Sequence, residues 1–181
     1  MHRNYKFYYF IENFNFKELS NINKSINIVF RNYSNINYLD DLLEIRDFCK
    51  KKGNKLYLSN NVKLAKRLLL DGVYLPAFNK KLVYNNLNSK KKFKIIGSAH
   101  NISEIKMKEK QNCDEIFLSP IFKTEKQKKY LDIIKFNLQT LATNKKIIAL
   151  GGVNFNNLKR VNLTKSKGIA SITWIKKNGL K

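Results

Sequence analysis

The fold is decided by residues 145–154, which read KKIIALGGVN. Within this stretch the apolar run Ile147–Leu150 predicts a strand that is buried on both faces. Two glycines follow at once, and a backbone without Cβ atoms can turn sharply and approach a ligand closely. Leu158–Val161 then predicts a helix, whose free N–H groups and positive dipole end favour phosphate. The pattern fits a phosphate cradle, but it also fits an ordinary turn between a strand and a helix.

A second stretch, Gly168–Thr173, predicts another buried strand that ends in small residues. Phosphate-binding loops after the last two strands are typical of (β/α)8 barrels. The two stretches together therefore direct attention to that fold.

The rest of the chain alternates between apolar or β-branched runs and amphipathic segments. Strands are predicted at Tyr5–Ile11, Ile26–Phe30, Lys55–Leu58, Gly72–Leu75, Phe93–Ile96, Glu115–Leu118, Ile147–Leu150 and Gly168–Thr173. Helices are predicted at Phe16–Ile22, Tyr38–Lys52, Asn61–Leu70, Lys81–Asn88, Ile102–Lys110, Leu131–Leu141 and Leu158–Val161. In the Leu131–Leu141 helix, Ile134, Leu138 and Leu141 share one side. Eight such units predict one compact TIM barrel over residues 1–181, with the last outer helix short or missing.

The composition limits the classes of protein that remain. The formal net charge of +23 fits either binding to nucleic acid or a membrane surface, or a bias toward Lys, Asn and Ile. The lysines are dispersed, which favours the bias. Cys49 and Cys113 are expected to be small buried residues, without a disulfide framework or a metal cluster. The sequence lacks a bilayer-length apolar run and a signal-peptide pattern, so a cytoplasmic protein that does not bind membranes is expected.

Chemistry in such a barrel belongs at the carboxyl ends of the strands. The residues predicted there are Arg31, Tyr33, Ser59, Asn60, Tyr74, Ala77, Asn79, Ser98, His100, Ser119, Thr124, Lys126, Gly151, Gly152, Ile172 and Thr173. The set is rich in cations and neutral hydrogen-bond donors and almost free of carboxylates. It favours the binding of phosphates and argues against hydrolysis by paired carboxylates. His100 is either a structural residue or an acid/base.

Four segments resemble the thiamine-phosphate synthase/TenI family in order and spacing: IGSAHN at 96–101, CDEIFLSPIFKT at 113–124, IALGGVN at 148–154 and GIA at 168–170. The N-terminal half agrees through Arg31 and through residues 62–65 and 71–75. The resemblance implies a (β/α)8 barrel. It also implies a reaction in which a pyrimidine pyrophosphate ionises, the nitrogen of a thiazole phosphate attacks, and pyrophosphate leaves with the help of Mg²⁺ and cations.

The resemblance also assigns roles to residues. Gly151–Gly152 and Ile172–Thr173, joined by Thr124, correspond to the site for the thiazole phosphate. Arg31 and Ser98 correspond to ligands of the pyrophosphate.

The sequence departs from the family pattern on the leaving-group side. The pattern Gln-x-Arg-x-Lys reads Val29-Phe30-Arg31-Asn32-Tyr33, and the family's Asn-Asp pair reads Ser59-Asn60. The acidic residue expected after the fourth strand is Asn79. Both magnesium carboxylates are thus neutral amides at Asn60 and Asn79, which predicts weakened metal binding. Gln127 replaces the loop lysine, and Lys126 or Lys128 could substitute for it.

Four hypotheses follow. The first is a divergent thiamine-phosphate synthase that acts on phosphorylated thiamine precursors and uses Mg²⁺ if that activity is retained. The second is a TenI-type thiazole tautomerase with His100 as its acid/base. The third is a barrel that binds a thiamine precursor without turnover. The fourth, a nucleic-acid-binding protein, rests on the charge alone.

Overall fold

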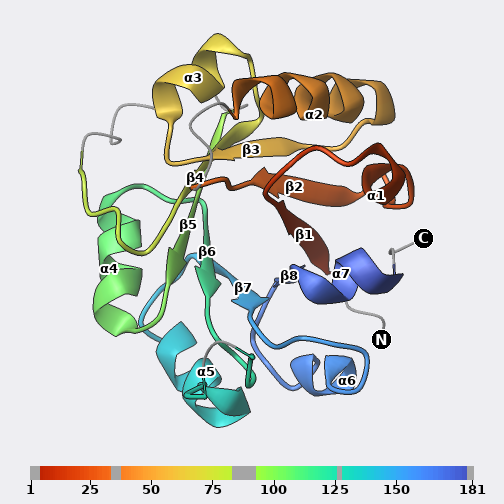
Figure 1. The fold of residues 1–181 in the computed structure, drawn as a ribbon. Helices are drawn as coiled ribbons and strands as arrows, with labels where there is room; N and C mark the ends of the chain where they lie inside the picture. Colours follow the sequence, from red (N-terminus) through yellow and green to blue (C-terminus); the bar gives the residue numbers. More distant parts are fainter. Residues whose placement is uncertain (1–4, 34–37, 83–92, 126–127, 179–181) are drawn as a thin grey trace.

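The computed structural model describes residues 5–33, 38–82, 93–125 and 128–178. Eight strands run through them: β1 Lys6–Ile11, β2 Ile26–Phe30, β3 Leu56–Ser59, β4 Gly72–Leu75, β5 Lys94–Ala99, β6 Glu115–Leu118, β7 Lys146–Leu150 and β8 Gly168–Ser171. Each strand pairs in parallel with the next, and β8 pairs with β1 to close the ring. The predicted barrel is confirmed, and Figure 1 shows the helices around the outside of the strands.

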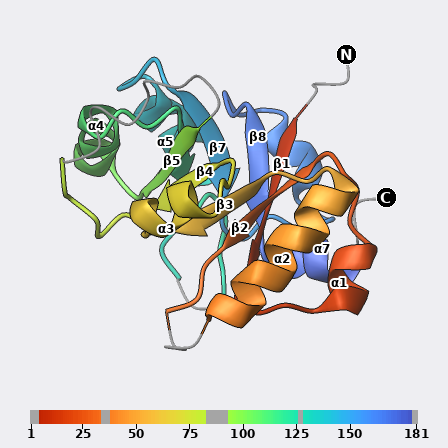
Figure 2. The same cartoon turned by 90° about the horizontal axis from the view of Figure 1, so that it is seen from above.

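The helices are α1 Phe16–Ser20, α2 Leu39–Lys52, α3 Val62–Arg67, α4 Ile102–Lys110, α5 Asp132–Thr140, α6 Leu158–Val161 and α7 Thr173–Asn178. Figure 2 shows α2, the longest of them, lying along the outside of β2 and β3. It ends at Gly53, whose φ of +85° is the left-handed conformation that glycine adopts readily. The short α7 confirms the expectation of a reduced last helix. The helix predicted over Lys81–Asn88 falls mostly outside the described residues.

Ile134, Leu138 and Leu141 lie together on the exposed side of α5, and the helix turns Phe136 and Thr140 onto the barrel. Both sets have helical spacing, so the choice between them depends on the strands underneath. The predicted end of the last strand at Thr173 was wrong, because β8 ends at Ser171 and Thr173 already begins α7.

The core has two layers. The larger one lies between the strands and the helices and includes the buried thiols of Cys49 and Cys113, as predicted. The smaller layer fills the barrel with side chains from alternate strand positions, mainly Tyr8, Phe10, Tyr57, Tyr74, Ile96 and Phe117. Neighbouring rings in this layer have centroids 4.8 to 6.0 Å apart, so the interior is packed and forms no channel. No helix within the described residues is long and apolar enough to cross a bilayer.

Candidate active site

The floor of the candidate site is the top of the aromatic layer. Phe10, Tyr74 and Phe117 contact one another there, with centroid distances of 5.2, 5.7 and 5.8 Å. Above this floor the strands give way to the loops that carry the predicted residues. An apolar floor keeps water from below and strengthens the interactions of charged groups at the mouth.

Arg31 lies directly after β2, and its backbone N–H donates to the Ile11 carbonyl at 2.8 Å. Its guanidinium lies 5.1 Å from the centroid of the Phe10 ring and 3.5 Å from a carboxylate oxygen of Glu12. Its Nε is buried and makes no hydrogen bond with the part of the chain that the structure describes. Because a buried N–H without a partner is costly, this group is suited to receive an anion.

Ser98, in β5, lies beside the same floor. Its hydroxyl accepts a hydrogen bond of 2.8 Å from the Tyr74 hydroxyl, and both side chains are buried. Burial raises the pKa of Tyr74 to about 12, although the hydrogen bond with Ser98 and the charge of Arg31 act to lower it. Tyr74 is therefore a neutral donor near pH 7, and it connects the Arg31 and Ser98 sides of the mouth. The sequence placed Tyr74 at the end of the fourth strand but gave it no specific role.

His100 follows β5 and is exposed at the mouth. Its Nδ1 lies 2.8 Å from the Ser119 carbonyl and 3.2 Å from the Ser119 hydroxyl. A carbonyl can only accept, so Nδ1 must carry a proton. In the neutral ring this leaves the lone pair on Nε2, which is the arrangement a general base requires. The His100 backbone N–H donates to Glu104 at 2.7 Å, and this bond fixes the start of the following helix.

Gly151 and Gly152 have φ values of +91° and +72°, both in the left-handed region. A Cβ on Gly151 would lie 2.8 Å from the Pro120 Cβ, and one on Gly152 would lie 2.5 Å from the Lys123 carbonyl oxygen. Packing against the segment after β6 thus requires both glycines, whatever they bind. Neither amide N–H donates to a described residue, so both remain available to a phosphate.

The other candidate phosphate ligands surround this turn. Thr124 follows Lys123, whose carbonyl packs against Gly152, and is half-buried. Ile172 and Thr173 come directly after β8, the neighbour of β7 in the barrel. The fold thus brings the two loops together as predicted. Lys126 and Gln127 lie outside the described residues.

Asn60 and Asn79 come from the ends of β3 and β4 and meet. The Asn79 side-chain amide donates to Asn60 Oδ1 at 2.6 Å. Asn79 Oδ1 in turn accepts from the Lys81 backbone N–H at 2.9 Å and from Gln111 Nε2 at 3.3 Å. Beside them a hollow of about 240 Å³ opens between β2 and β3, lined in part by Tyr33 and Asn60.

Behind the amide pair lies a lysine that was not predicted as part of the site. Lys108 of α4 is fully buried, and its Nζ donates to the carbonyls of Pro76 and Asn79 and to Gln111 Oε1, at 2.8 to 2.9 Å. Burial lowers its pKa to about 8. The only signal in the sequence was a lysine three residues after Ile105, on the apolar side of the helix.

The implied Mg²⁺ does not fit these residues. The oxygens of Asn60 and Asn79 already accept hydrogen bonds, and the Lys108 cation lies against the Asn79 backbone. Magnesium prefers carboxylates and water in an octahedron. Within the described ranges, no group of three or more His, Cys, Asp or Glu side chains is placed to hold a metal. The contacts of the amide pair agree with the expectation of weakened metal binding, which stays a prediction.

Comparison with known proteins agrees with this geometry. Residues 21–175 match the family described as thiamine monophosphate synthase. A thiamine-phosphate synthase of Hydrogenobaculum sp. is 30% identical over 155 residues, which cover 81% of this chain and 69% of that protein. One from Prochlorococcus marinus subsp. pastoris is also 30% identical over 81% of this chain, but the match covers only 41% of that longer protein.

Among solved structures, a thiamine phosphate pyrophosphorylase from Pyrococcus furiosus has a TM-score of 0.71 at 17% identity, covering 97% of this chain and 92% of that one. An N-(5'-phosphoribosyl)anthranilate isomerase from the same organism has a TM-score of 0.67 at 14% identity, covering 98% and 92%. These similarities concern the fold. The match over residues 21–175 shows that the chain belongs to the thiamine monophosphate synthase family.

Proposed function

We propose that this chain couples hydroxymethylpyrimidine pyrophosphate to thiazole phosphate, the reaction of its family, and releases pyrophosphate. The observation that carries the proposal is the pair of anion-binding groups at one end of the barrel. Arg31, whose buried Nε has no partner among the described residues, is on one side. The amides of Gly151 and Gly152, which donate to none of those residues, are on the other. Such a mouth suits two phosphorylated substrates that must meet.

In this proposal Arg31 and Ser98 hold the leaving pyrophosphate, with Asn60 as a neutral ligand beside them. Gly151–Gly152 and Ile172–Thr173, with Thr124 and Lys126, hold the thiazole phosphate. The pyrimidine's C–O bond breaks with its electron pair on the pyrophosphate, and the thiazole nitrogen forms the new C–N bond. Because the amide pair does not suit Mg²⁺, stabilisation of the leaving group falls to the Arg31 cation and the hydrogen bonds of this chain's own residues.

The phosphorylated precursors are the proposed partners, and the cytoplasm is the proposed compartment. Nucleic acid has no part in this function. The net charge of +23 would instead attract anionic substrates to the mouth.

A thiazole tautomerase is the second candidate, and the state of His100 favours it. With Nδ1–H held by the Ser119 carbonyl, Nε2 could take a proton from a bound thiazole phosphate and return it to another carbon. That reaction would need the phosphate cradle and no pyrophosphate site. It predicts that Arg31 is dispensable and His100 is not.

One experiment separates the candidates. Pyrophosphate release is measured with both substrates, in EDTA and across a Mg²⁺ titration, for the wild type, Arg31→Gln and His100→Ala. The synthase proposal expects release that Arg31→Gln abolishes. Absence of release under all conditions, with proton exchange into the thiazole phosphate that His100→Ala abolishes, would establish the tautomerase instead. Calorimetric binding of thiazole phosphate without either reaction would point to a barrel that only binds it.

A further inference from the structure

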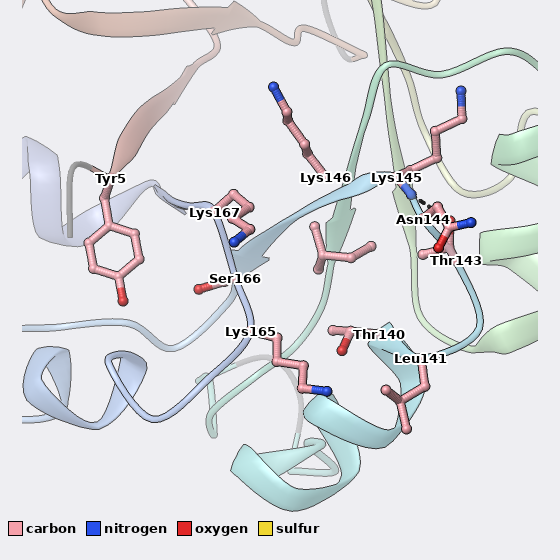
Figure 3. A pocket seen from close by; sticks show the side chains of 11 residues that line it. Tyr5, Thr140, Leu141, Thr143, Asn144, Lys145, Lys146, Lys165, Ser166 and Lys167 are labelled. Carbon is pink, nitrogen blue, oxygen red and sulfur yellow. Dashed lines mark hydrogen bonds between the residues drawn. The ribbon is translucent and has the colours of Figure 1, made fainter.

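A second hollow lies at the opposite end of the barrel from the candidate active site. It has a volume of about 650 Å³ and is formed where β7 and β8 begin, beside the last turn of α5. Its lining includes Lys145, Lys146, Lys165 and Lys167 (Figure 3). The volume falls within the range of small-molecule sites. None of the roles proposed above uses it.

The ammonium groups in this hollow lack the partners that other lysines have. Elsewhere Lys6 and Lys94 lie against Glu115, and Lys52 donates to two carbonyls of α1. The ammonium groups of Lys146, Lys165 and Lys167, by contrast, form no ion pair or hydrogen bond with any residue that the structure describes. As far as the described residues show, these three ammonium groups therefore have no direct partner.

Two acidic residues lie near this cluster: Glu115, whose Cα pairs with that of Lys146 and whose carboxylate contacts Lys6 and Lys94, and Glu109 at the edge. Glu109 of α4 accepts hydrogen bonds from Lys106 and Thr143. Burial alone would raise the pKa of Glu109, but these bonds and the charges of Lys106 and Lys145 lower it overall. Glu109 is thus ionised and partly neutralises Lys145, while the lysines before β8 remain uncompensated.

Three polar side chains of the hollow other than lysine are already engaged. The Ser166 hydroxyl is 2.7 Å from that of Thr164, Thr140 donates to the Asn137 carbonyl at 2.7 Å, and Tyr5 donates to Asn162 at 3.0 Å. The lysines, with Asn144 beside them, are the main groups left to hold a ligand, which favours an anion.

The arrangement of the lysines suggests the shape of that anion. In Figure 3, Lys145 and Lys146 extend away from Lys165, so the cations are spread apart and do not converge on one point. A single phosphate could contact only part of this set. A short linear chain of phosphates would contact more of it, and bringing several anionic groups near would relieve the repulsion among the lysines.

We propose that the hollow between β7, β8 and α5 is a second anion site that binds a short oligophosphate, either free or as the phosphate chain of a nucleotide. It is separate from the mouth of the barrel, because it lies at the amino ends of the strands. Its affinity falls steeply with added salt, as expected for binding through exposed cations.

The test is calorimetric titration with inorganic tripolyphosphate and with orthophosphate at low salt. Lys165→Gln/Lys167→Gln is compared with Lys50→Gln/Lys51→Gln, which removes the same charge from α2, and with Arg31→Gln, which alters the mouth. We expect tripolyphosphate to bind more tightly than orthophosphate. The mouth, which is proposed to hold pyrophosphate, is expected to bind tripolyphosphate as a separate class of site that Arg31→Gln weakens. For the hollow we expect a loss of about tenfold in Lys165→Gln/Lys167→Gln, since exposed ion pairs each contribute modestly, and little change in the other two variants. Circular dichroism confirms that each variant is folded.

Other outcomes would overturn the proposal. A loss only in Arg31→Gln would place the oligophosphate in the mouth. Equal losses in both double-lysine variants would reflect net charge alone. Binding of a long single-stranded RNA without binding of tripolyphosphate would indicate a nucleic-acid surface. If the site does bind tripolyphosphate, titration with a nucleoside triphosphate and with the matching nucleoside separates the free chain from the nucleotide.

Discussion

Lys108 is predicted to make stability depend on pH in a way that one substitution removes. The side chain is fully buried in α4, and its ammonium group has three oxygen acceptors but no carboxylate against it. Because burial lowers its pKa from 10.5 to about 8, the folded protein loses this proton more readily than the unfolded chain.

The direction and size of this change in the free energy of unfolding follow from proton linkage. Between the two pKa values the unfolded state binds more protons, so the free energy of unfolding rises with pH. A fall from 10.5 to about 8 corresponds to about 3 kcal/mol in total. About 2 kcal/mol of this should appear between pH 7 and pH 9.5. The full penalty is present below pH 8, where the folded state holds the buried charge.

The assay is urea unfolding of the wild type and Lys108→Met at several pH values in this range. Burial also raises the pKa values of Cys49 and Cys113 to about 12, but both proteins carry these thiols, so their effect cancels in the difference. Lys106→Met, an exposed position on the same helix, is the control and should give a difference that does not change with pH. If the difference in the free energy of unfolding between the wild type and Lys108→Met also does not change with pH, Lys108 does not have a lowered pKa in the folded protein.

Three further predictions concern the mouth. Gly152→Ala should lower the free energy of unfolding by about 2 kcal/mol or more, because a φ of +72° strains alanine and its Cβ would meet the Lys123 carbonyl. Urea unfolding measures this loss, and an unchanged unfolding midpoint would contradict it. Mg²⁺ titration by calorimetry should show no tight binding to the wild type, whereas Asn60→Asp/Asn79→Asp should gain affinity; tight wild-type binding would contradict the poor fit of the amide pair. If the synthase proposal holds, His100→Ala should leave pyrophosphate release within about tenfold of the wild type, and a loss of a hundredfold or more would give His100 a direct part in coupling.

Much of the barrel could be predicted because its strands are short apolar runs between helices. Ile147–Leu150 reads as a doubly buried strand in any context, and β7 begins only one residue earlier. The buried face of α5 could not be predicted in this way, because Ile134 and Phe136 belong to two sides of the helix that have the same helical spacing. Which stripe packs inward depends on the neighbouring strands, and local spacing carries no such information.

The candidate site likewise contains residues that could be predicted from the sequence and residues that could not. Gly151, Gly152 and Arg31 could be located because each directly follows a strand, where a parallel barrel gathers its functional groups. The contacts of Lys108 with Pro76 and Asn79 join residues about thirty positions apart and depend on how α4 packs against the loop after β4. The burial of Glu115 beside Tyr8 and Lys6 spans the barrel in the same way. Such long-range polar contacts leave no periodic pattern in the sequence.

The measurement that tests the central claim most directly is pyrophosphate release from the two substrates by the wild type and Arg31→Gln, side by side. The synthase proposal predicts release by the wild type and a fall of at least a hundredfold in the variant, as is usual when a charged ligand of a leaving group is removed. Wild-type protein that binds thiazole phosphate but releases no pyrophosphate, or an Arg31→Gln variant as active as the wild type, would contradict it.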